Sequence, residues 1–250
     1  MLSISVPNVF VVSLKRSVER REKIANEMAE KSISFIFFDA VDGNQGLPDL
    51  AADYDYAKRL WLTSGYMPSK GELGCYASHY ALWVKCIEMG EPIVVCEDDI
   101  TLSDEAPSIL SLALKKAQQY GFVRLEDIEP GGERTQVESS DSGTVYLMKD
   151  NYGGTRAYAI SPTAAMRLVK HRWCYPVDCF IGANFLHGQY SYQMEPLLVK
   201  THGEDCSTVQ DTVRNRAPLY RKPSRELYTL YKKIMLSLMY WRKRKEISRR

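Results

Sequence analysis

The chain lacks any long apolar run. No stretch of about 18 consecutive apolar residues occurs, so the sequence predicts no transmembrane helix. The first residues, MLSISVPNVFVVSLKRS, show no basic segment before their apolar stretch and no clear cleavage site, so we expect no signal peptide. None of the six cysteines forms a CxxC pair, which argues against a zinc-ribbon or thioredoxin-like site. Without an export signal, we expect the thiols to be free and buried.

The net charge of the chain is small, but the charged residues are unevenly distributed. The net charge is +2, yet residues 214–250 hold 13 Lys/Arg and 2 Asp/Glu, which gives +11 and leaves −9 for the rest. The segment LYTLYKKIMLSLMYWRKRKEISRR mixes apolar and basic residues, which favours an anionic membrane surface as its partner. A nonspecific basic tail or nucleic-acid contact is the alternative, and the acidic body argues against nucleic acid. We therefore predict a catalytic domain over residues 1–213 and a basic, amphipathic, membrane-associated tail over 214–250.

Strand and helix patterns alternate along the chain. The β-branched run NVFVVSL (8–14) predicts a buried strand, a charged amphipathic helix follows, and SFIFFDAVDG (34–43) predicts a second strand. This order favours a right-handed parallel βαβ unit. The polar, Gly/Ser-rich segment 129–143 reads as a surface loop. Because the alternation continues to the last predicted strand, the class is α/β.

Two helices carry cap signals. Ser69 and Glu72 have the S-x-x-E spacing of a capping box, and Gly90 supplies the C-terminal stop of the same helix. Ser161 is the expected N-cap of a later helix, with Pro162 at its first position.

The segment EPIVVCEDDI (91–100) joins a predicted strand directly to Glu97, Asp98 and Asp99. Ligands of open α/β sheets bind beyond the carboxyl ends of the strands. Crowded carboxylates cannot all stay ionised without compensation, and a divalent cation that prefers oxygen ligands supplies it. The alternative is an acidic helix start, because carboxylates favour the positive end of a helix.

Six segments in order resemble glycosyltransferase family 25, the lipooligosaccharide-type galactosyltransferases, which are similar to the collagen galactosyltransferases. They are VFVVSLKRSVERRE, FFDAVDG, GELGCYASHYALW, VVCEDDI, GGTRAYAIS and YPVD, between about Val9 and His202. The resemblance implies a GT-A-like nucleotide-sugar-binding fold, with a mixed, mostly parallel central sheet flanked by helices. It also implies a UDP-sugar donor, usually UDP-galactose, inversion at the anomeric carbon and a divalent metal, for which we expect Mn²⁺ before Mg²⁺.

In this family resemblance the EDD triplet takes the part of the DxD motif, whose metal bridges the last carboxylate and the donor phosphates. Asp99 is therefore the expected metal ligand, while Glu97 and Asp98 shape the donor site or hold the ribose. His202 follows the apolar run PLLVK, where GT-A enzymes often carry a metal-binding histidine. A surface or core histidine is the alternative at this position.

Further donor-binding residues are expected at the first two strand ends. Leu14 and Arg16 end the first strand, where backbone groups and the guanidinium would grip uracil or phosphate. Arg20, one turn further, reads as part of a solvated helix face. Asp42 would accept a ribose hydroxyl, or it belongs to an Asp-Gly turn. His79 reads as a structural histidine in the middle of a helix, and its match to the family motif leaves a donor-site contact open.

Inverting transfer needs one general base for the acceptor hydroxyl. Our first choice is Asp178 in YPVDCF, for which a helix cap is the alternative, and our second choice is Glu126 or Asp127. Gly154 and Thr155 would let an acceptor approach the backbone closely.

The sequence thus predicts a glycosyltransferase that moves galactose onto a lipooligosaccharide or another surface glycan. Its expected partners are a UDP-sugar, a lipid-linked oligosaccharide and an anionic membrane, and its expected place is cytoplasmic, on the inner face of the cell membrane. A metal-dependent nucleotidyltransferase is one alternative, but residues 13–21 (SLKRSVERR) lack the glycines of a phosphate loop. A non-catalytic, membrane-attached protein on a transferase fold is another, against which the intact EDD argues.

Overall fold

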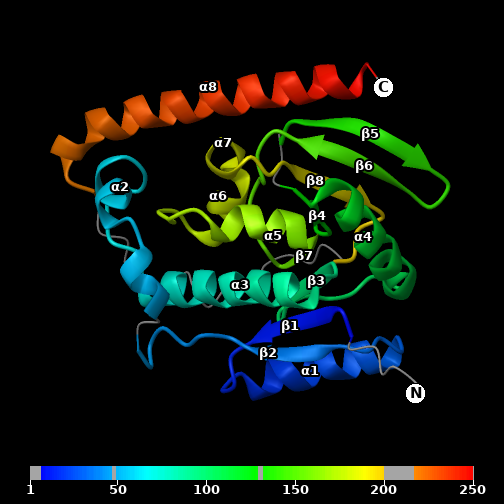
Figure 1. Cartoon of the computed structure of the whole chain (residues 1–250). Helices are drawn as coiled ribbons and strands as arrows, with labels where there is room; N and C mark the ends of the chain where they lie inside the picture. The colour runs from blue at the N-terminus through cyan, green and yellow to red at the C-terminus, as the bar shows by residue number, and fades with distance from the viewer. Residues whose placement is uncertain (1–6, 47–48, 129–131, 200–216, 250) are drawn as a thin grey trace.

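The computed structural model describes residues 7–46, 49–128, 132–199 and 217–249. Within these ranges one eight-stranded sheet, in the order β2-β1-β3-β7-β4-β8-β6-β5, forms the centre of the molecule and helices flank it (Figure 1). The strands are β1 (Val9–Ser13), β2 (Ile36–Asp39), β3 (Ile93–Glu97), β4 (Phe122–Arg124), β5 (Arg134–Ser140), β6 (Gly143–Met148), β7 (Ala157–Ile160) and β8 (Ser191–Glu195). The helices are α1 (Val18–Glu30), α2 (Tyr56–Trp61), α3 (Lys70–Met89), α4 (Ala106–Tyr120), α5 (Pro162–Val169), α6 (Val177–Gly182), α7 (Asn184–His187) and α8 (Lys222–Ile247), with 3-10 helices at Asp49–Asp53 and Leu219–Arg221.

The sheet is mixed, as the sequence predicts. Strands β1, β2 and β3 are mutually parallel and so are β4 and β8, whereas β7 and β6 pair antiparallel with their neighbours. Following these pairings from strand to strand, six of the eight described strands run one way, and β6 and β7 run the other. The predicted βαβ unit, β1-α1-β2, is present with its parallel pairing.

The alternation of side chains along β1 divides the core into two layers. Val9 and Val11 face the layer that holds α1 and α4, while Phe10 and Val12 face the layer that holds α3, α5 and α6. All five β1 residues are buried, which agrees with an uninterrupted apolar run between two parallel neighbours.

The predicted helix caps are confirmed. The Ser69 hydroxyl accepts from the Glu72 amide at 3.0 Å, and Gly90 ends α3 in the left-handed conformation with φ +70°. Ser161 caps α5 through the Ala164 amide. The cap at Ser69 fixes the first turn of α3, the helix that carries Cys75, Ser78 and His79.

The prediction of a surface loop over residues 129–143 is wrong for the second half of this segment. Arg134–Ser140 forms β5, an edge strand that pairs antiparallel with β6. Its polar residues belong there because an edge strand has one side open to water, while Val137 packs against the core. Glu138 accepts from the Tyr120 hydroxyl at 2.7 Å and pairs with Lys116, so α4 holds this strand.

The basic tail folds as α8 and packs along the body, beside α7 and near α2 (Figure 1). Leu236 and Tyr240 are buried, and the hydroxyl groups of Tyr228 and Tyr175 lie 3.0 Å apart. The predicted boundary between residues 213 and 214 lies outside the described residues. No helix of the described chain is both long enough and apolar enough to cross a membrane. The five cysteines in the described ranges are free thiols, as expected, but only Cys86, Cys96 and Cys174 are buried, whereas Cys75 and Cys179 are half-buried.

Candidate active site

A cleft of about 150 Å³ lies where β1, β2 and β3 end. Because these strands are parallel, their carboxyl ends meet at one edge of the sheet, and the antiparallel β7 begins at the same edge. The N-terminal half of α3 closes one side of the cleft. The lining residues are Val12, Ser13, Leu14, Arg16, Ser17, Arg20, Ala40, Val41, Asp42, Gly43, Asn44, Gly71, Cys75, Ser78, His79, Glu97, Asp98 and Asp99.

Asp98 connects the ends of two strands. Its carboxylate accepts from the Ser13 hydroxyl of β1 at 2.6 Å and lies 3.4 Å from Nη1 of Arg20. The residue is only 8% exposed. Both oxygens thus have partners within the protein, and the two roles expected of Asp98, shaping the donor site or holding the ribose, stay predictions.

Glu97 points toward α3 and the start of β7. The Thr155 hydroxyl donates to its Oε1 at 2.9 Å, and Nε2 of His79 lies 3.7 Å from the same oxygen. Burial raises the pKa of Glu97, but the His79 and Thr155 contacts and the charge of Arg156 outweigh it, so the pKa lies below its usual value. Glu97 is therefore an acceptor for groups on α3 and on the loop before β7, and its expected role in shaping the donor site stays a prediction.

Asp99 is the carboxylate of the triplet whose hydrogen bonding the described residues leave incomplete. Its Oδ1 is buried without a hydrogen-bond partner, and Arg20 approaches its Oδ2 at 3.7 Å. Burial, followed by the negative charges of Glu97 and Asp98, raises the pKa of Asp99 to about 6 despite Arg20. A buried oxygen with raised pKa and no partner fits a cation ligand.

The described residues do not form a complete metal site by themselves, since no group of three His, Cys, Asp or Glu side chains among them lies close enough. The residues present fit a metal that takes one carboxylate from the chain and its other ligands from elsewhere. His202, the second predicted ligand, lies outside the described residues.

Arg20 is a cleft residue, and its interpretation as part of a solvated helix face is wrong. It lies in the first turn of α1, which begins at Val18 shortly after the end of β1. Its guanidinium contacts both Asp98 and Asp99. The available signal was the place of Arg20 in the first turn of a helix that follows the first strand end.

Arg16 and Asp42 face each other across the cleft. Nε of Arg16 donates to Oδ2 of Asp42 at 2.7 Å, and Asp42 also accepts from the Asn44 amide, which is the turn predicted as the alternative. The Arg16 hydrogen bond first, and the Asn44 amide second, lower the pKa of Asp42. Leu14 lies beside them in the lining of the cleft. A nucleotide would have to share or displace this ion pair.

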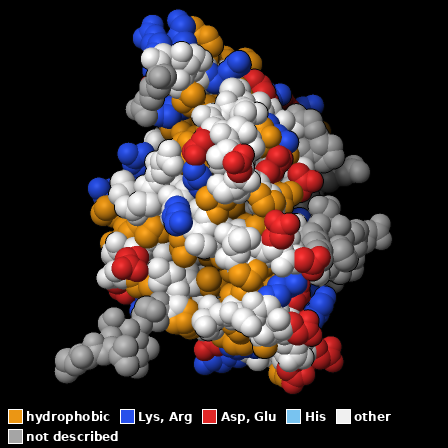
Figure 2. All heavy atoms as spheres, turned by 90° about the vertical axis from the view of Figure 1, so that its right-hand side faces the viewer, with side chains coloured by type: hydrophobic (Ala, Val, Ile, Leu, Met, Phe, Trp, Pro, Cys, Tyr) orange, Lys and Arg blue, Asp and Glu red, His pale blue; other side chains and the backbone are white. Residues whose placement is uncertain are grey.

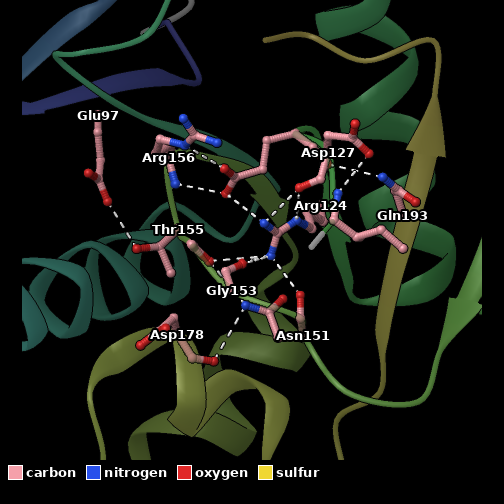
Figure 3. Close-up of polar contacts among 12 residues, drawn as sticks. Glu97, Arg124, Asp127, Asn151, Gly153, Thr155, Arg156, Asp178 and Gln193 are labelled. Carbon is pink, nitrogen blue, oxygen red and sulfur yellow. Dashed lines mark hydrogen bonds and ion pairs between the residues drawn. The ribbon is translucent and has the colours of Figure 1, made fainter. Parts of the chain in front are cut away.

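A buried network of hydrogen bonds, which Figure 3 shows, holds the loop before β7. The guanidinium of Arg124 binds the carbonyl groups of Asn151 and Gly153, and Nδ2 of Asn151 donates to the Gly154 carbonyl at 3.1 Å. Gly154 has φ +61°, and a Cβ there would lie 2.9 Å from both carboxylate oxygens of Glu126. This loop places Thr155, which reaches Glu97.

Glu126, a second-choice base, is 1% exposed and bound to Arg156 by two hydrogen bonds, from the amide at 2.9 Å and from Nε at 2.8 Å. Burial raises its pKa, against the effects of Arg124 and Arg156. This placement does not favour proton transfer to a substrate. Asp127 is exposed and accepts from the Ile128 amide.

Asp178 lies in the first turn of α6, where Pro176 is the cap residue and no side-chain cap hydrogen bond forms. Its backbone carbonyl accepts from Nδ2 of Asn151 at 3.4 Å, so Asp178 is tied to the same loop as Thr155 (Figure 3). Burial raises the pKa of the Cys75 thiol, and the charges of Glu97 and Asp178 add to this effect. Asp178 itself is not among the residues that line the cleft. The alternative of a helix cap is not realised.

His79 is 1% exposed and hydrogen-bonded, as expected of a structural histidine, yet it also lines the cleft. Cys75, which sequence reasoning did not select, lies one turn before it on the same helix face.

Comparisons with known proteins place the chain in a family. The profile of "Glycosyltransferase family 25 (LPS biosynthesis protein)" matches residues 6–181, which contain every cleft residue. "Lipooligosaccharide biosynthesis protein lic2B" of Haemophilus influenzae is 34% identical over 213 residues, covering 78% of this chain and 76% of the relative. "Glycosyltransferase 25 family member" of Aedes aegypti is 30% identical over 190 residues, covering 72% of this chain.

Not every relative is described as active. "Inactive glycosyltransferase 25 family member 3" of Mus musculus is 36% identical over 195 residues and 71% of this chain. The chain spans 31% of the mosquito relative and 31% of the mouse relative. The chain belongs to glycosyltransferase family 25.

Proposed function

We propose that this protein transfers a sugar from a UDP-sugar donor, with UDP-galactose as the first candidate, to a surface-glycan acceptor, with inversion at the anomeric carbon. The observation that carries the proposal is the unpartnered Oδ1 of Asp99, buried at the edge of a cleft formed by the ends of parallel strands. Ligand sites of α/β sheets occur at such an edge. Family membership supports the reaction class, and the name of the Haemophilus relative supports lipooligosaccharide as the acceptor class.

Asp99 would hold the divalent cation, Mn²⁺ before Mg²⁺, with His202 as a further candidate ligand. Bound there, the cation would stabilise the negative charge that develops on the nucleoside diphosphate leaving group. Arg20 lies next to Asp99 and adds a second positive charge at the same end of the cleft. Asp98 and Ser13 keep the ends of β1 and β3 in register, so that Asp99 and Arg20 stay in place.

The nucleotide part of the donor would occupy the side of the cleft formed by Leu14, Arg16 and Asp42. Arg16 is half-exposed, so its guanidinium can turn from Asp42 to a phosphate or a base. Asp42, freed in this way, can accept a ribose hydroxyl. Gly154 and Thr155 would lie on the acceptor side, since their loop connects Glu97 to Asp178.

Asp178 would take the proton from the acceptor hydroxyl as that oxygen attacks the anomeric carbon. The described contacts of its carboxylate consist of one long contact with the Cys179 thiol at 3.8 Å, so no described cation neutralises it. A carboxylate that is not paired with a cation can act as a base, which distinguishes Asp178 from Glu126.

The acceptor would be lipid-linked, and α8 would bring the protein to the anionic inner face of the cell membrane. Apolar side chains on the outward side of α8 stay exposed, with fractions of 70% at Leu227, 50% at Ile234 and 54% at Trp241. Figure 2 shows Lys and Arg side chains gathered at the top of the molecule, at the C-terminal end of this helix. Apolar and basic groups together suit an anionic lipid surface.

The test is a screen of UDP-sugars for turnover with and without a chelator. We expect turnover of at least one UDP-sugar that stops in chelator and returns with Mn²⁺. Asp99→Asn keeps the size of the side chain but weakens cation binding, so it should lose this turnover, whereas Asp141→Asn at an exposed turn should not. Full activity of Asp99→Asn would contradict the role of Asp99. No turnover of any UDP-sugar with any acceptor preparation would favour a non-catalytic protein.

A further inference from the structure

Three aromatic side chains form a buried chain of hydrogen bonds behind the cleft. The hydroxyl oxygen of Tyr158 on β7 lies 2.9 Å from Nδ1 of His79 and 3.1 Å from Nε1 of Trp83, both on α3. All three residues are at most 1% exposed. Nε2, the other ring nitrogen of His79, lies 3.7 Å from Oε1 of Glu97, at the cleft.

The number of protons on these three side chains determines the direction of each hydrogen bond. The indole nitrogen of Trp83 can only donate, so the Tyr158 oxygen must accept from it. Burial raises the pKa of the Tyr158 phenol well above its usual value, so the hydroxyl keeps its single proton. Among the described residues, the remaining neighbour of this hydroxyl is Nδ1 of His79. The hydroxyl therefore donates to Nδ1, which must carry a lone pair.

The opposite arrangement leaves a donor without a partner. If Nδ1 carried a proton, the Tyr158 oxygen would accept from both rings and its own proton would find no described acceptor. An unpaired buried donor is costly. On the cleft side, Nε2 lies 3.7 Å from Oε1 of Glu97, and a carboxylate oxygen accepts hydrogen bonds, so a proton on Nε2 suits this contact as well.

We propose that Trp83 and Tyr158 hold His79 as the neutral tautomer with its proton on Nε2, so that His79 is a hydrogen-bond donor to the Glu97 side of the cleft. Tyr158 and Trp83 are positioning residues that act through His79. A histidine in this state has no free lone pair, because Nε2 carries the proton and Nδ1 is occupied by Tyr158. His79 therefore cannot take a proton from an acceptor hydroxyl, although it is the histidine that lines the cleft.

This assignment rests on the proposed function only for the deprotonation of the acceptor hydroxyl. It excludes His79 as the general base of that step and leaves the role to Asp178. The tautomer itself concerns the free protein and needs no substrate. Its test can fail while sugar transfer is established, or succeed while no transfer is found.

The experiment is a long-range ¹H–¹⁵N correlation spectrum of the ¹⁵N-labelled full chain near pH 7, in which protonated and lone-pair ring nitrogens have well-separated shifts. The chain has four histidines, and His79→Gln identifies the signals of His79 by their loss. We expect Nε2 of His79 at the protonated position and Nδ1 at the lone-pair position. A protonated Nδ1, alone or together with a protonated Nε2, would overturn the proposal.

Tyr158→Phe tests the source of the constraint. It removes the hydroxyl and keeps the ring, so the Nδ1 signal should move toward the position of a lone pair without a hydrogen bond. Tyr146→Phe is the matched control, because its hydroxyl binds Glu195 on a different part of the sheet, and it should leave both His79 signals in place. An unchanged Nδ1 signal in Tyr158→Phe would show that Tyr158 does not donate to His79. The wild-type spectrum decides the tautomer even if this variant fails to fold.

Discussion

At Asp99, burial and two neighbouring carboxylates raise the pKa to about 6, above the value of about 3.9 expected in an unfolded chain. The folded state therefore holds this proton more tightly than the unfolded state. Between about pH 4 and pH 6, Asp99 loses its proton in the unfolded chain but keeps it in the folded protein. The free energy of unfolding therefore falls as the pH rises through this range, and it stays lower at higher pH.

This predicts that Asp99→Asn stabilises the metal-free protein at neutral pH, by about 1–3 kcal/mol, while it weakens cation binding. The gain should be small at pH 4.5 and reach its full size above about pH 6.5. Urea unfolding of both proteins in chelator at two pH values measures it, with Asp141→Asn as a control at an exposed site. A less stable Asp99→Asn at neutral pH would show that Arg20 outweighs the burial.

Asp178→Asn keeps the shape of the side chain but cannot accept a proton at neutral pH. If Asp178 is the base, the transfer rate should fall by roughly two to four orders of magnitude, the usual contribution of a positioned base. UDP binding and the melting temperature should stay near wild type, because the side chain makes no cap hydrogen bond. Transfer within about threefold of wild type would move the role to Asp127, the more exposed of the two second choices.

The element that carries the membrane proposal is α8, which has two apolar faces. One face packs on the body through Tyr228, Leu236 and Tyr240. The opposite face exposes an apolar stripe, because its residues recur at helical spacing on one side. The stripe consists of Leu227, Leu230, Tyr231, Ile234, Leu238 and Trp241. Truncating the helix would disturb the packed face, so point substitutions in the stripe are the sharper test.

Replacing Leu230, Ile234 and Leu238 by Gln should weaken binding to vesicles that contain phosphatidylglycerol by roughly tenfold or more, because each apolar side chain buried in lipid contributes about 1.5–3 kcal/mol. Thr229→Gln with Ser237→Gln, two exposed positions of the same helix, is the matched control. Vesicle sedimentation measures binding. Equal binding of all variants would exclude the stripe as the lipid contact, and concentration-dependent dimers that the triple variant abolishes would assign it to a second copy.

Across the whole molecule, the site exists because the sheet brings distant segments to one edge. Ser13 and Asp98 are 85 residues apart and Thr155 and Glu97 are 58 apart, yet each pair forms a hydrogen bond at that edge. Parallel pairing of β1, β2 and β3 aligns their carboxyl ends, and the antiparallel β7 adds the start of its own strand there. A cleft built from the ends of three strands and from two helices, α1 and α3, can hold several charged groups that no single segment could position.

The sequence by itself determined the α/β class, the first βαβ unit, both Ser caps and the acidic triplet at a strand end. These features depend on local pattern, that is, on β-branched runs, cap residues and the residue that follows a strand. It failed at β5, because the polar composition of an edge strand resembles that of a loop. It also failed at Arg20, because exposure of one side of α1 depends on what packs against the helix.

Only the tertiary structure decided how the charged residues divide their roles. The sequence shows three equivalent carboxylates. In the fold, Asp98 contacts Ser13 and Arg20, whereas Glu97 contacts His79 and Thr155. One oxygen of Asp99 is left without a partner. In the same way it pairs Glu126 with Arg156 and keeps Asp178 free of described cations. These differences arise from contacts between residues far apart in the chain and from burial, which sets the cost of each charge.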